Sequence, residues 1–378
     1  MNRVSKTMTI GIFFGYILLL PILTLFLPKE DFSEVENRKL SSMPNFSAES
    51  VFNRKYMNGI EKYLSDHFVG RSSWIGIKTN IELAMGKKEI NGVFILENRL
   101  VKRMNEPDYS LVDKSVEAIN DFSEKYDMPV FVMVAPASGG IYMDELPIYS
   151  GSYNQKTLID YVYNHLDGEE VTSLNAYSAL FATRDEYIYY RTDHHWTSLG
   201  AYYAYSSTIQ KMGFTPVSLG RFDIEHASRS FKGTLYSDVV YDGIQNDVID
   251  YYFNKSGPKI TSLTVGTGDK LRVFDSLYFR EYLDKKDKYA SFTGPNEPFV
   301  NIKTDASSGK KLLLFKDSYA HCYVPFLAQH YSEIEMVDLR YINSSLENYI
   351  DVNKYDQVMF LYNAVNFAED ENIKKLGF

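Results

Sequence analysis

Residues 192–197, with the sequence TDHHWT, combine one carboxylate with two imidazoles directly before a segment typical of a helix start. In an extended segment, Asp193 and His195 lie on the same side of the backbone, and His194 points to the other side. A carboxylate beside an imidazole can fix its tautomer and stabilise the imidazolium. Histidine also exchanges a proton near neutral pH. The pattern therefore predicts that Asp193 and His195 are the acid and base of a catalytic site.

A nucleophile for that base is offered by residues 312–331, LLLFKDSYAHCYVPFLAQHY. A short apolar strand ends at Phe315, a turn carries Asp317 and Ser318, and a helix follows. A serine in this turn lies at the carboxyl edge of a sheet, where α/β proteins bind ligands, and beside helix N–H groups that stabilise negative charge. These are the requirements of an acyl-transfer nucleophile. The alternative is that Asp317 or Ser318 only caps the helix.

The segment FLYNAVNF, residues 360–367, places Tyr362 and Asn363 at the end of another strand. A side-chain amide just beyond a strand that neighbours the nucleophile is a suitable donor to an oxyanion. An asparagine that only shapes a turn is an equally good interpretation of this segment alone.

Asp193, His194 and His195 are also residue types that bind zinc or manganese. Consecutive histidines do not easily aim at one ion, and the sequence has no HxH or HxxxH spacing. The single cysteine, Cys322, excludes a cysteine-based zinc cluster and an intrachain disulfide. We therefore predict no metal and no cofactor. A metal-dependent hydrolase and a purely structural role for the histidines stay open as alternatives.

Apolar runs that suit buried parallel strands alternate with amphipathic helical segments from residue 109 onward. This alternation is typical of a three-layer α/β sandwich with a parallel central sheet. Residues 215–305 are rich in strand-like segments with Gly and Pro breaks, and we expect a β-rich insertion there. The predicted strands are 129–136, 170–174, 311–315, 334–339 and 357–362, and the predicted helices are 109–126, 155–166 and 319–331.

The N-terminal run TMTIGIFFGYILLLPILTLFLP, residues 7–28, has no charged residue and would span roughly 33 Å as a helix. Arg3 and Lys6 precede it, so the positive-inside rule places the N-terminus in the cytoplasm and the rest outside. The run is longer than the core of a signal peptide and lacks a small-x-small cleavage site, which favours an uncleaved anchor. The predicted organisation is a cytoplasmic tip and anchor at 1–28, N-terminal helices and a hairpin at 29–108, and a catalytic domain at 109–378.

The composition narrows the class of partner. The chain of 378 residues carries a formal charge of -9 and has no cluster of Lys and Arg, which disfavours nucleic acid as the main partner, and we predict none. Its content of 45% hydrophobic and 15% aromatic residues indicates a folded globular body.

Taken together, the segments TDHHWT, KDSYA and VDLRY resemble the DHHW family, a branch of the SGNH-hydrolase-like proteins that is similar to the alginate O-acetylation proteins. The pairing of TDHHW with a downstream DSY is fairly specific. The resemblance covers nearly the whole chain beyond the anchor, because further segments also look like this family, namely SEVENRKL, YLSDHFVGR, GVFILENRLV, MVAPASGGIYMDELP and FKGTLYS. It implies a flavodoxin-like sandwich with a Ser–His–Asp triad.

The resemblance also implies a role for each residue. By motif, Ser318 is the nucleophile, His195 the base and Asp193 its orienting acid. One departure concerns Lys316, which stands where a Gly-Asp-Ser turn would have glycine, so the backbone N–H of Ser318 is the safer oxyanion donor. Weaker roles in oxyanion or substrate binding fall to Asn363, Tyr362, Arg340 and Trp196, and we expect the indole to pack behind the imidazole.

Members of this group are linked to O-acetylation of exported polysaccharides, beside a multi-pass membrane O-acyltransferase that supplies the acyl group. The resemblance therefore implies a bacterial, membrane-anchored, extracytoplasmic serine acyltransferase or esterase with a polysaccharide acceptor. A noncatalytic polysaccharide-binding or assembly protein is the alternative from a different class.

Overall fold

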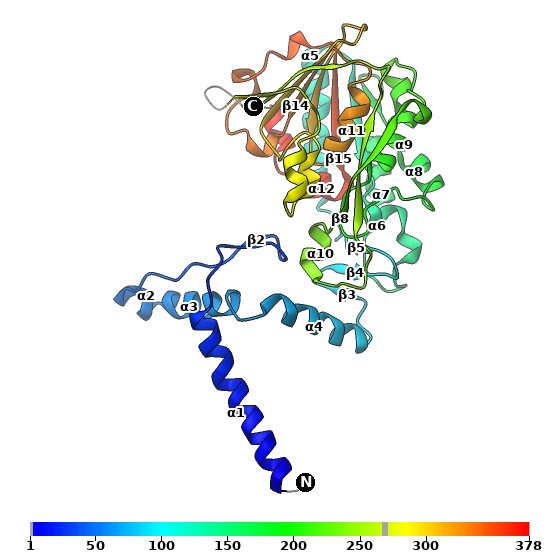
Figure 1. The fold of residues 1–378 in the computed structure, drawn as a ribbon. Helices are drawn as coiled ribbons and strands as arrows, with labels where there is room; N and C mark the ends of the chain where they lie inside the picture. The colour runs from blue at the N-terminus through cyan, green and yellow to red at the C-terminus, as the bar shows by residue number, and fades with distance from the viewer. Residues whose placement is uncertain (1–2, 267–270, 378) are drawn as a thin grey trace. The chain divides into compact units, whose positions relative to one another are not determined.

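The computed structural model describes residues 3–266 and 271–377, and Figure 1 shows their fold. The chain forms two compact units. The first unit comprises the residues up to 91 together with 236–243, and the second comprises 92–235 and the chain from 244 onward.

The first unit is mainly helical and begins with α1, Arg3–Phe26. Among the described residues, α1 provides the one helix that is long and apolar enough to cross a membrane, over Ser5–Phe26. The first unit also contains the elements α2 (Ala48–Phe52), α3 (Lys55–Asp66), α4 (Arg71–Ala84), β1 (Phe32–Ser33), β2 (Arg38–Lys39) and β3 (Glu89–Ile90).

Within the described residues of the second unit, an eight-stranded sheet has the order β11-β10-β12-β14-β13-β15-β6-β7. The strands from β14 to β7 run parallel, and β12, β10 and β11 join antiparallel at one edge. The predicted parallel sheet is therefore present and has an antiparallel extension. The strands are β6 (Val130–Ala135), β7 (Val171–Ser173), β10 (Ile260–Val265), β11 (Arg272–Phe274), β12 (Phe299–Thr304), β13 (Lys311–Lys316), β14 (Glu333–Val337) and β15 (Gln357–Asn363).

Helices cover both faces of this sheet. The crossover from β6 to β7 through α7 and the crossover from β13 to β14 through α11 run in opposite directions along the sheet, so right-handed connections put α7 and α11 on opposite faces. Helix α5 contacts α7 and α12, whereas α9 contacts α11 (Figure 1). This is the predicted three-layer sandwich. The helices are α5 (Tyr109–Tyr126), α6 (Ser138–Ile141), α7 (Gln155–His165), α8 (Tyr177–Ala182), α9 (Ser198–Thr208), α11 (Ala320–Leu327) and α12 (Ala364–Glu369).

One predicted helix, at 319–331, is shorter in the structure, because α11 ends at Leu327. Beyond that point the N–H groups of Gln329 and His330 bond to carbonyl groups three positions earlier, so the chain tightens into a turn. Pro325 lies inside α11 and has no N–H to donate.

The predicted β-rich insertion at 215–305 contributes to two sheets. Strands β8 (Asp223–Phe231) and β9 (Asp247–Phe253) pair with each other in a two-stranded antiparallel sheet, whereas β10, β11 and β12 extend the central one. The short helix α10, Thr234–Val239, follows β8 in the chain. The hairpin β4 (Val93–Ile95) and β5 (Leu100–Lys102) is antiparallel, as its sequence predicts.

Candidate active site

The turn between β13 and α11 presents Ser318 at the carboxyl edge of the sheet. The buried carboxylate of Asp317 holds this turn, because it accepts hydrogen bonds from the N–H groups of Tyr319 and Asn363, each at 2.8 Å. The side-chain amides of Asn363 and Asn366 donate to the same carboxylate at 2.7 Å and 2.8 Å. Asp317 therefore ties the serine turn to the end of the neighbouring strand β15.

The segment that carries Asp193 and His195 is fixed by another buried acid, Asp247 at the start of β9. Its carboxylate accepts the N–H of Arg191 at 2.7 Å and the N–H of Thr192 at 2.8 Å. Because β9 belongs to the folded core, these bonds fix where the next residues of the loop can lie.

The structure brings Asp193, His195 and Ser318 into one line of hydrogen bonds. The Nδ1 atom of His195 lies 2.6 Å from Oδ1 of Asp193, and its Nε2 atom lies 2.7 Å from Oγ of Ser318. A carboxylate only accepts hydrogen bonds, so Nδ1 carries the proton and Nε2 is free to accept the serine proton. The arrangement can therefore activate a serine by general-base chemistry.

The second oxygen of Asp193 is held by the segment that follows β8. The N–H of Thr234 donates to Oδ2 at 2.8 Å and its hydroxyl donates at 3.0 Å. The preceding Gly233 lies so close that an added Cβ would be 2.2 Å from Cβ of Asp193, so only glycine fits there. Both residues belong to the segment FKGTLYS, a motif that carried the family resemblance without an assigned role.

Tyr289 contacts both the base and the nucleophile segment. Its ring stacks on the imidazole of His195 with centroids 3.7 Å apart and planes 8° from parallel. Its hydroxyl donates to the backbone oxygen of Ser318 at 3.0 Å. Burial raises the pKa of Tyr289 well above its usual value, so the hydroxyl keeps its proton. Sequence reasoning missed this residue, since nothing distinguishes it among 31 tyrosines.

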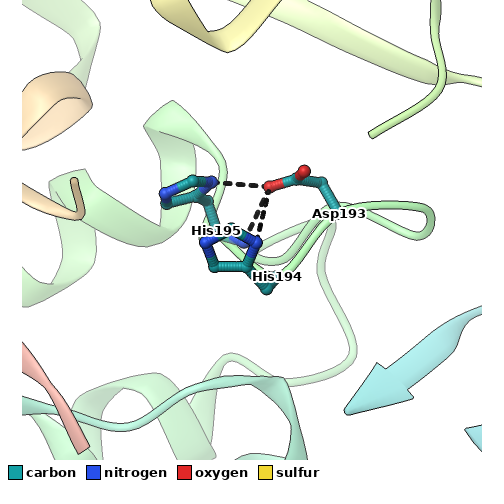
Figure 2. Close-up of side chains that lie close together, drawn as sticks. All are labelled: Asp193, His194 and His195. Atoms are coloured by element: carbon teal, nitrogen blue, oxygen red, sulfur yellow. Dashed lines mark hydrogen bonds and ion pairs between the residues drawn. The ribbon is translucent and has the colours of Figure 1, made fainter. Parts of the chain in front are cut away.

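The prediction that His194 points away from its neighbours is wrong. Figure 2 shows both imidazoles beside Asp193, and the two rings have centroids 3.9 Å apart. The Nδ1 atom of His194 lies 2.7 Å from the hydroxyl oxygen of Thr234, whose own proton goes to Asp193. Nδ1 of His194 must therefore donate, and its Nε2 is an acceptor. The loop is irregular rather than a strand, so side chains do not alternate in direction.

The local electrostatics follow from this packing. Burial alone would raise the pKa of Asp193, but the two histidines and the hydrogen bonds to its carboxylate hold it well below its usual range. Burial, followed by the charge of His195, lowers the pKa of His194 to about 4. Asp193 is thus ionised and His194 neutral at neutral pH.

The same three residues could also hold a cation. One ligand atom each from Asp193, His194 and His195 lie within 4.8 Å of one another. Consecutive histidines were expected not to aim easily at one ion, whereas these two place ligand atoms close together beside Asp193. A metal ion bound to these residues would replace the hydrogen bond between Asp193 and His195. Metal binding and the triad chemistry therefore exclude each other.

A cavity of about 360 Å³ opens over this site. Of the weaker predicted residues, Asn363 and Arg340 line it. The Asn363 amide is already bonded to Asp317, and its Oδ1 caps α12 through the N–H of Val365 at 3.0 Å. The side chain of Arg340 is 34% exposed, and its guanidinium forms an ion pair with the buried carboxylate of Asp338 at 2.6 Å.

The other two weaker residues are not among the described residues that line the cavity. Trp196 is fully buried, and its indole N–H donates to the backbone oxygen of Tyr319 at 3.0 Å. It packs on Tyr319 and Tyr323, so the ring behind the imidazole is that of Tyr289 and not of Trp196. Tyr362 is also buried, and its hydroxyl has no hydrogen-bond partner in the described part of the chain.

The unusual residue Lys316 points away from solvent altogether, with no exposed side chain. Its ammonium group donates to Oδ1 of Asn296 at 3.1 Å and lies 3.4 Å from Asp338 and 3.0 Å from Nε2 of His321. Burial lowers the pKa of Lys316. The lysine therefore stabilises one wall of the cavity through its contacts with Asn296 and His321, which line it.

Comparisons with known proteins agree with the fold. A family model described as DHHW protein matches residues 36–122 and 86–337. A DHHW family protein from Eubacterium siraeum is 28% identical, with a TM-score of 0.66, over 76% of this chain and 96% of that one. The structure of Bacillus cereus PatB1 with a sulfonyl adduct is 21% identical, with a TM-score of 0.64, over 75% of this chain and 97% of that one. A search of curated proteins found no match.

Proposed function

This chain belongs to the DHHW protein family, and from that premise we propose that it is a membrane-anchored, extracytoplasmic serine acyltransferase or esterase. Its substrate would be the O-acetyl groups of a cell-surface or exported polysaccharide. The observation that carries the proposal is the pair of hydrogen bonds that His195 makes, at 2.6 Å to Asp193 and at 2.7 Å to Ser318, at the edge of a cavity.

In the first step, Oγ of Ser318 attacks the carbonyl carbon of the donor ester while its proton passes to Nε2 of His195. Asp193 stabilises the imidazolium that forms. The tetrahedral intermediate then expels the donor alkoxide, which takes the proton back from His195. The products of this step are an acyl ester on Ser318 and a free donor alcohol, so atoms and charges balance.

The oxyanion of the intermediate needs donors that are already in place. The N–H of Ser318 is one candidate, because the turn around Asp317 fixes its orientation. The second N–H of the Asn363 amide is another, since the hydrogen bond to Asp317 uses one of its two protons.

In the second step, His195 takes a proton from a sugar hydroxyl, and that oxygen attacks the acyl carbon on Ser318. The bond from the acyl carbon to Oγ then breaks, and Oγ takes the proton back from Nε2 of His195, so the products are the acylated sugar and free Ser318. When water attacks instead, the same site releases acetate as an esterase. The anchor at Ser5–Phe26 would raise the concentration of the site near a multi-pass membrane O-acyltransferase that delivers the acyl group.

A metal-dependent hydrolase is the second candidate, because ligand atoms of Asp193, His194 and His195 lie within 4.8 Å of one another. The two candidates differ in their response to a chelator. The serine mechanism keeps its full activity in EDTA and is inhibited when added zinc breaks the Asp193–His195 hydrogen bond. The metal mechanism loses its activity in EDTA.

The decisive experiment treats the full chain with a sulfonyl fluoride, which transfers its sulfonyl group to an activated serine and releases fluoride. We expect one adduct by intact mass on Ser318, its loss in Ser318→Ala, and slower formation in His195→Ala. The variant Ser308→Ala, at an exposed serine, should be labelled like the wild type. A folded chain that takes up no label and hydrolyses no chromogenic acetyl ester would refute the proposal.

A further inference from the structure

Helix α4 and the residue that ends it, Met85, carry a line of exposed apolar side chains on one face. The exposed fractions are 39% for Trp74, 48% for Ile77, 54% for Ile81 and 76% for Met85. These positions are spaced by three and four residues, so they share one side of the helix. Large apolar groups that cluster in this way mark a surface that normally meets another apolar phase.

The opposite face of α4 is already packed. Thr79 is 2% exposed and donates its hydroxyl proton to the backbone oxygen of Val239 at 2.6 Å. At Gly76, an added Cβ would be 3.5 Å from the backbone oxygen of Val240, which is ordinary contact distance. The contacts of α4 with residues 239 and 240 therefore leave the exposed apolar line uncovered.

The start of α4 is joined to the end of the apolar helix α1. The N–H of Val69, just before α4, donates to the hydroxyl of the buried Thr24 at 3.2 Å. The ring of Trp74 meets the ring of Tyr16 edge-on, with centroids 5.9 Å apart. The apolar line of α4 is thus continuous with the helix that has the length and composition of a membrane span.

The charge of this region differs from that of the whole chain. Residues 48–88 contain seven basic and four acidic side chains, whereas the protein has a net charge of -9. Helix α4 itself contains Arg71, Lys78 and Glu82, and Arg71 is ion-paired with Glu36 at 2.7 Å, so most of the basic excess lies in the residues on either side of the helix. An apolar helical face accompanied by basic groups suits the boundary between acyl chains and anionic headgroups.

We propose that α4 lies on the membrane surface, with Trp74, Ile77, Ile81 and Met85 among the lipid acyl chains. The ligand is a phospholipid bilayer that contains anionic headgroups. This inference rests on the anchoring part of the proposed function, since α1 must cross the same bilayer. The covering of this face by another protein is the competing outcome.

The experiment uses the full chain in nanodiscs of phosphatidylcholine and phosphatidylglycerol, with a spin label on one introduced cysteine. The native Cys322 is buried and stays unlabelled. The test variant is Ile81→Cys. The matched control is Asn80→Cys, one residue away and exposed, and Leu18→Cys in α1 reports on the anchor itself.

We expect the label at position 81 to collide several times more often with oxygen, which dissolves in lipid, than with a water-soluble nickel complex. The label at position 80 should show the reverse. An Ile81 label that prefers the nickel complex, or is shielded from both reagents, overturns the proposal while a lipid-exposed Leu18 label leaves the anchor intact. A Leu18 label in water means that the anchoring itself fails, whatever α4 does.

A second measurement needs no added probe. Trp74 and Trp196 are the two tryptophans of the chain, and Trp196 is fully buried. Acyl-brominated lipids should quench part of the wild-type fluorescence and none of the fluorescence of Trp74→Phe. Equal emission in brominated and plain lipids in the wild type would contradict a position of Trp74 in the bilayer. Sulfonylation of Ser318 in the same samples tests the proposed chemistry separately.

Discussion

Tyr289 covers one face of the His195 imidazole, with ring centroids 3.7 Å apart and planes 8° from parallel. The same side chain donates its hydroxyl proton to the backbone oxygen of Ser318 at 3.0 Å. One residue therefore restrains the base through its ring and the nucleophile turn through its hydroxyl. Both restraints act on the pair of residues whose Nε2 and Oγ atoms lie 2.7 Å apart.

Changes at Tyr289 should separate these two restraints. Tyr289→Phe keeps the stacked ring and loses the hydroxyl contacts to the Ser318 carbonyl at 3.0 Å and to Sγ of Cys322 at 3.3 Å, so we expect the sulfonylation rate of Ser318 to fall about threefold to tenfold. Tyr289→Leu also loses the stacked ring, and its rate should be lower again. The control is Tyr278→Phe, whose hydroxyl lies away from the site, donates to the Tyr252 carbonyl at 2.9 Å and accepts the N–H of Tyr252 at 3.0 Å. An equal loss of rate in the control would assign the effect to general destabilisation.

The role of Asp193 can be tested in the same way, by comparing one variant of this residue with one control variant. Asp193→Asn preserves the shape of the side chain but removes the charge that stabilises the imidazolium, so kcat for a chromogenic acetyl ester should fall on the order of 10³–10⁴-fold. The control is Asp250→Asn, because Asp250 also holds a histidine, His226, at 2.6 Å but has no catalytic serine beside it. We expect unchanged activity in that variant. A comparable loss in both variants would argue against the triad.

Asp317 should matter for stability as well as for the site. Its buried carboxylate accepts bonds from the N–H groups of Tyr319 and Asn363 and from two side-chain amides. In Asp317→Asn one acceptor becomes a donor that faces other donors, so the free energy of unfolding in urea should fall by roughly 2–4 kcal/mol. Asp305→Asn, at an exposed carboxylate with one backbone bond, should change it by less than about 0.5 kcal/mol. Similar losses at both positions would contradict the organising role of Asp317.

The elements that follow from local patterns were predictable from the sequence. Helix α5 has the predicted bounds, and its start is marked by Asp108, whose carboxylate accepts the N–H of Ser110 at 2.9 Å. Strand β6 is apolar at every position and buried at every position. Ser318, His195 and Asp193 could be singled out because each stands in a distinctive motif.

What the sequence could not reveal depends on contacts between distant segments. Tyr289 and Asp247 reach the site from positions with no local signature, so only the folded chain identifies them. The direction of His194 was wrong because alternation holds for strands and not for a loop held by Asp247. Trp196 was misplaced behind the imidazole for a related reason, since motif proximity does not fix which face a ring covers.

The stability of the fold should also depend on pH through His330, a partly buried histidine outside the site. Burial lowers the pKa of His330 to about 4, from an ordinary value of 6.5. The unfolded chain therefore binds this proton more readily, so stability is full above pH 6.5 and falls as the pH drops toward 4. At pH 5 the unfolding free energy lost through this protonation is on the order of 1 kcal/mol.

This contribution can be isolated with His330→Gln. Nε2 of His330 lies 2.6 Å from the hydroxyl of Tyr205, which itself accepts the N–H of Val217 at 2.8 Å. A glutamine side chain has both an oxygen acceptor and an N–H donor, so it can bond to the Tyr205 hydroxyl whichever group donates. The variant should lose less unfolding free energy than the wild type between pH 7 and pH 5, as measured in urea. If the variant and the wild type lose the same unfolding free energy between pH 7 and pH 5, removal of the histidine has no effect. That result would show that His330 does not take up a proton on unfolding.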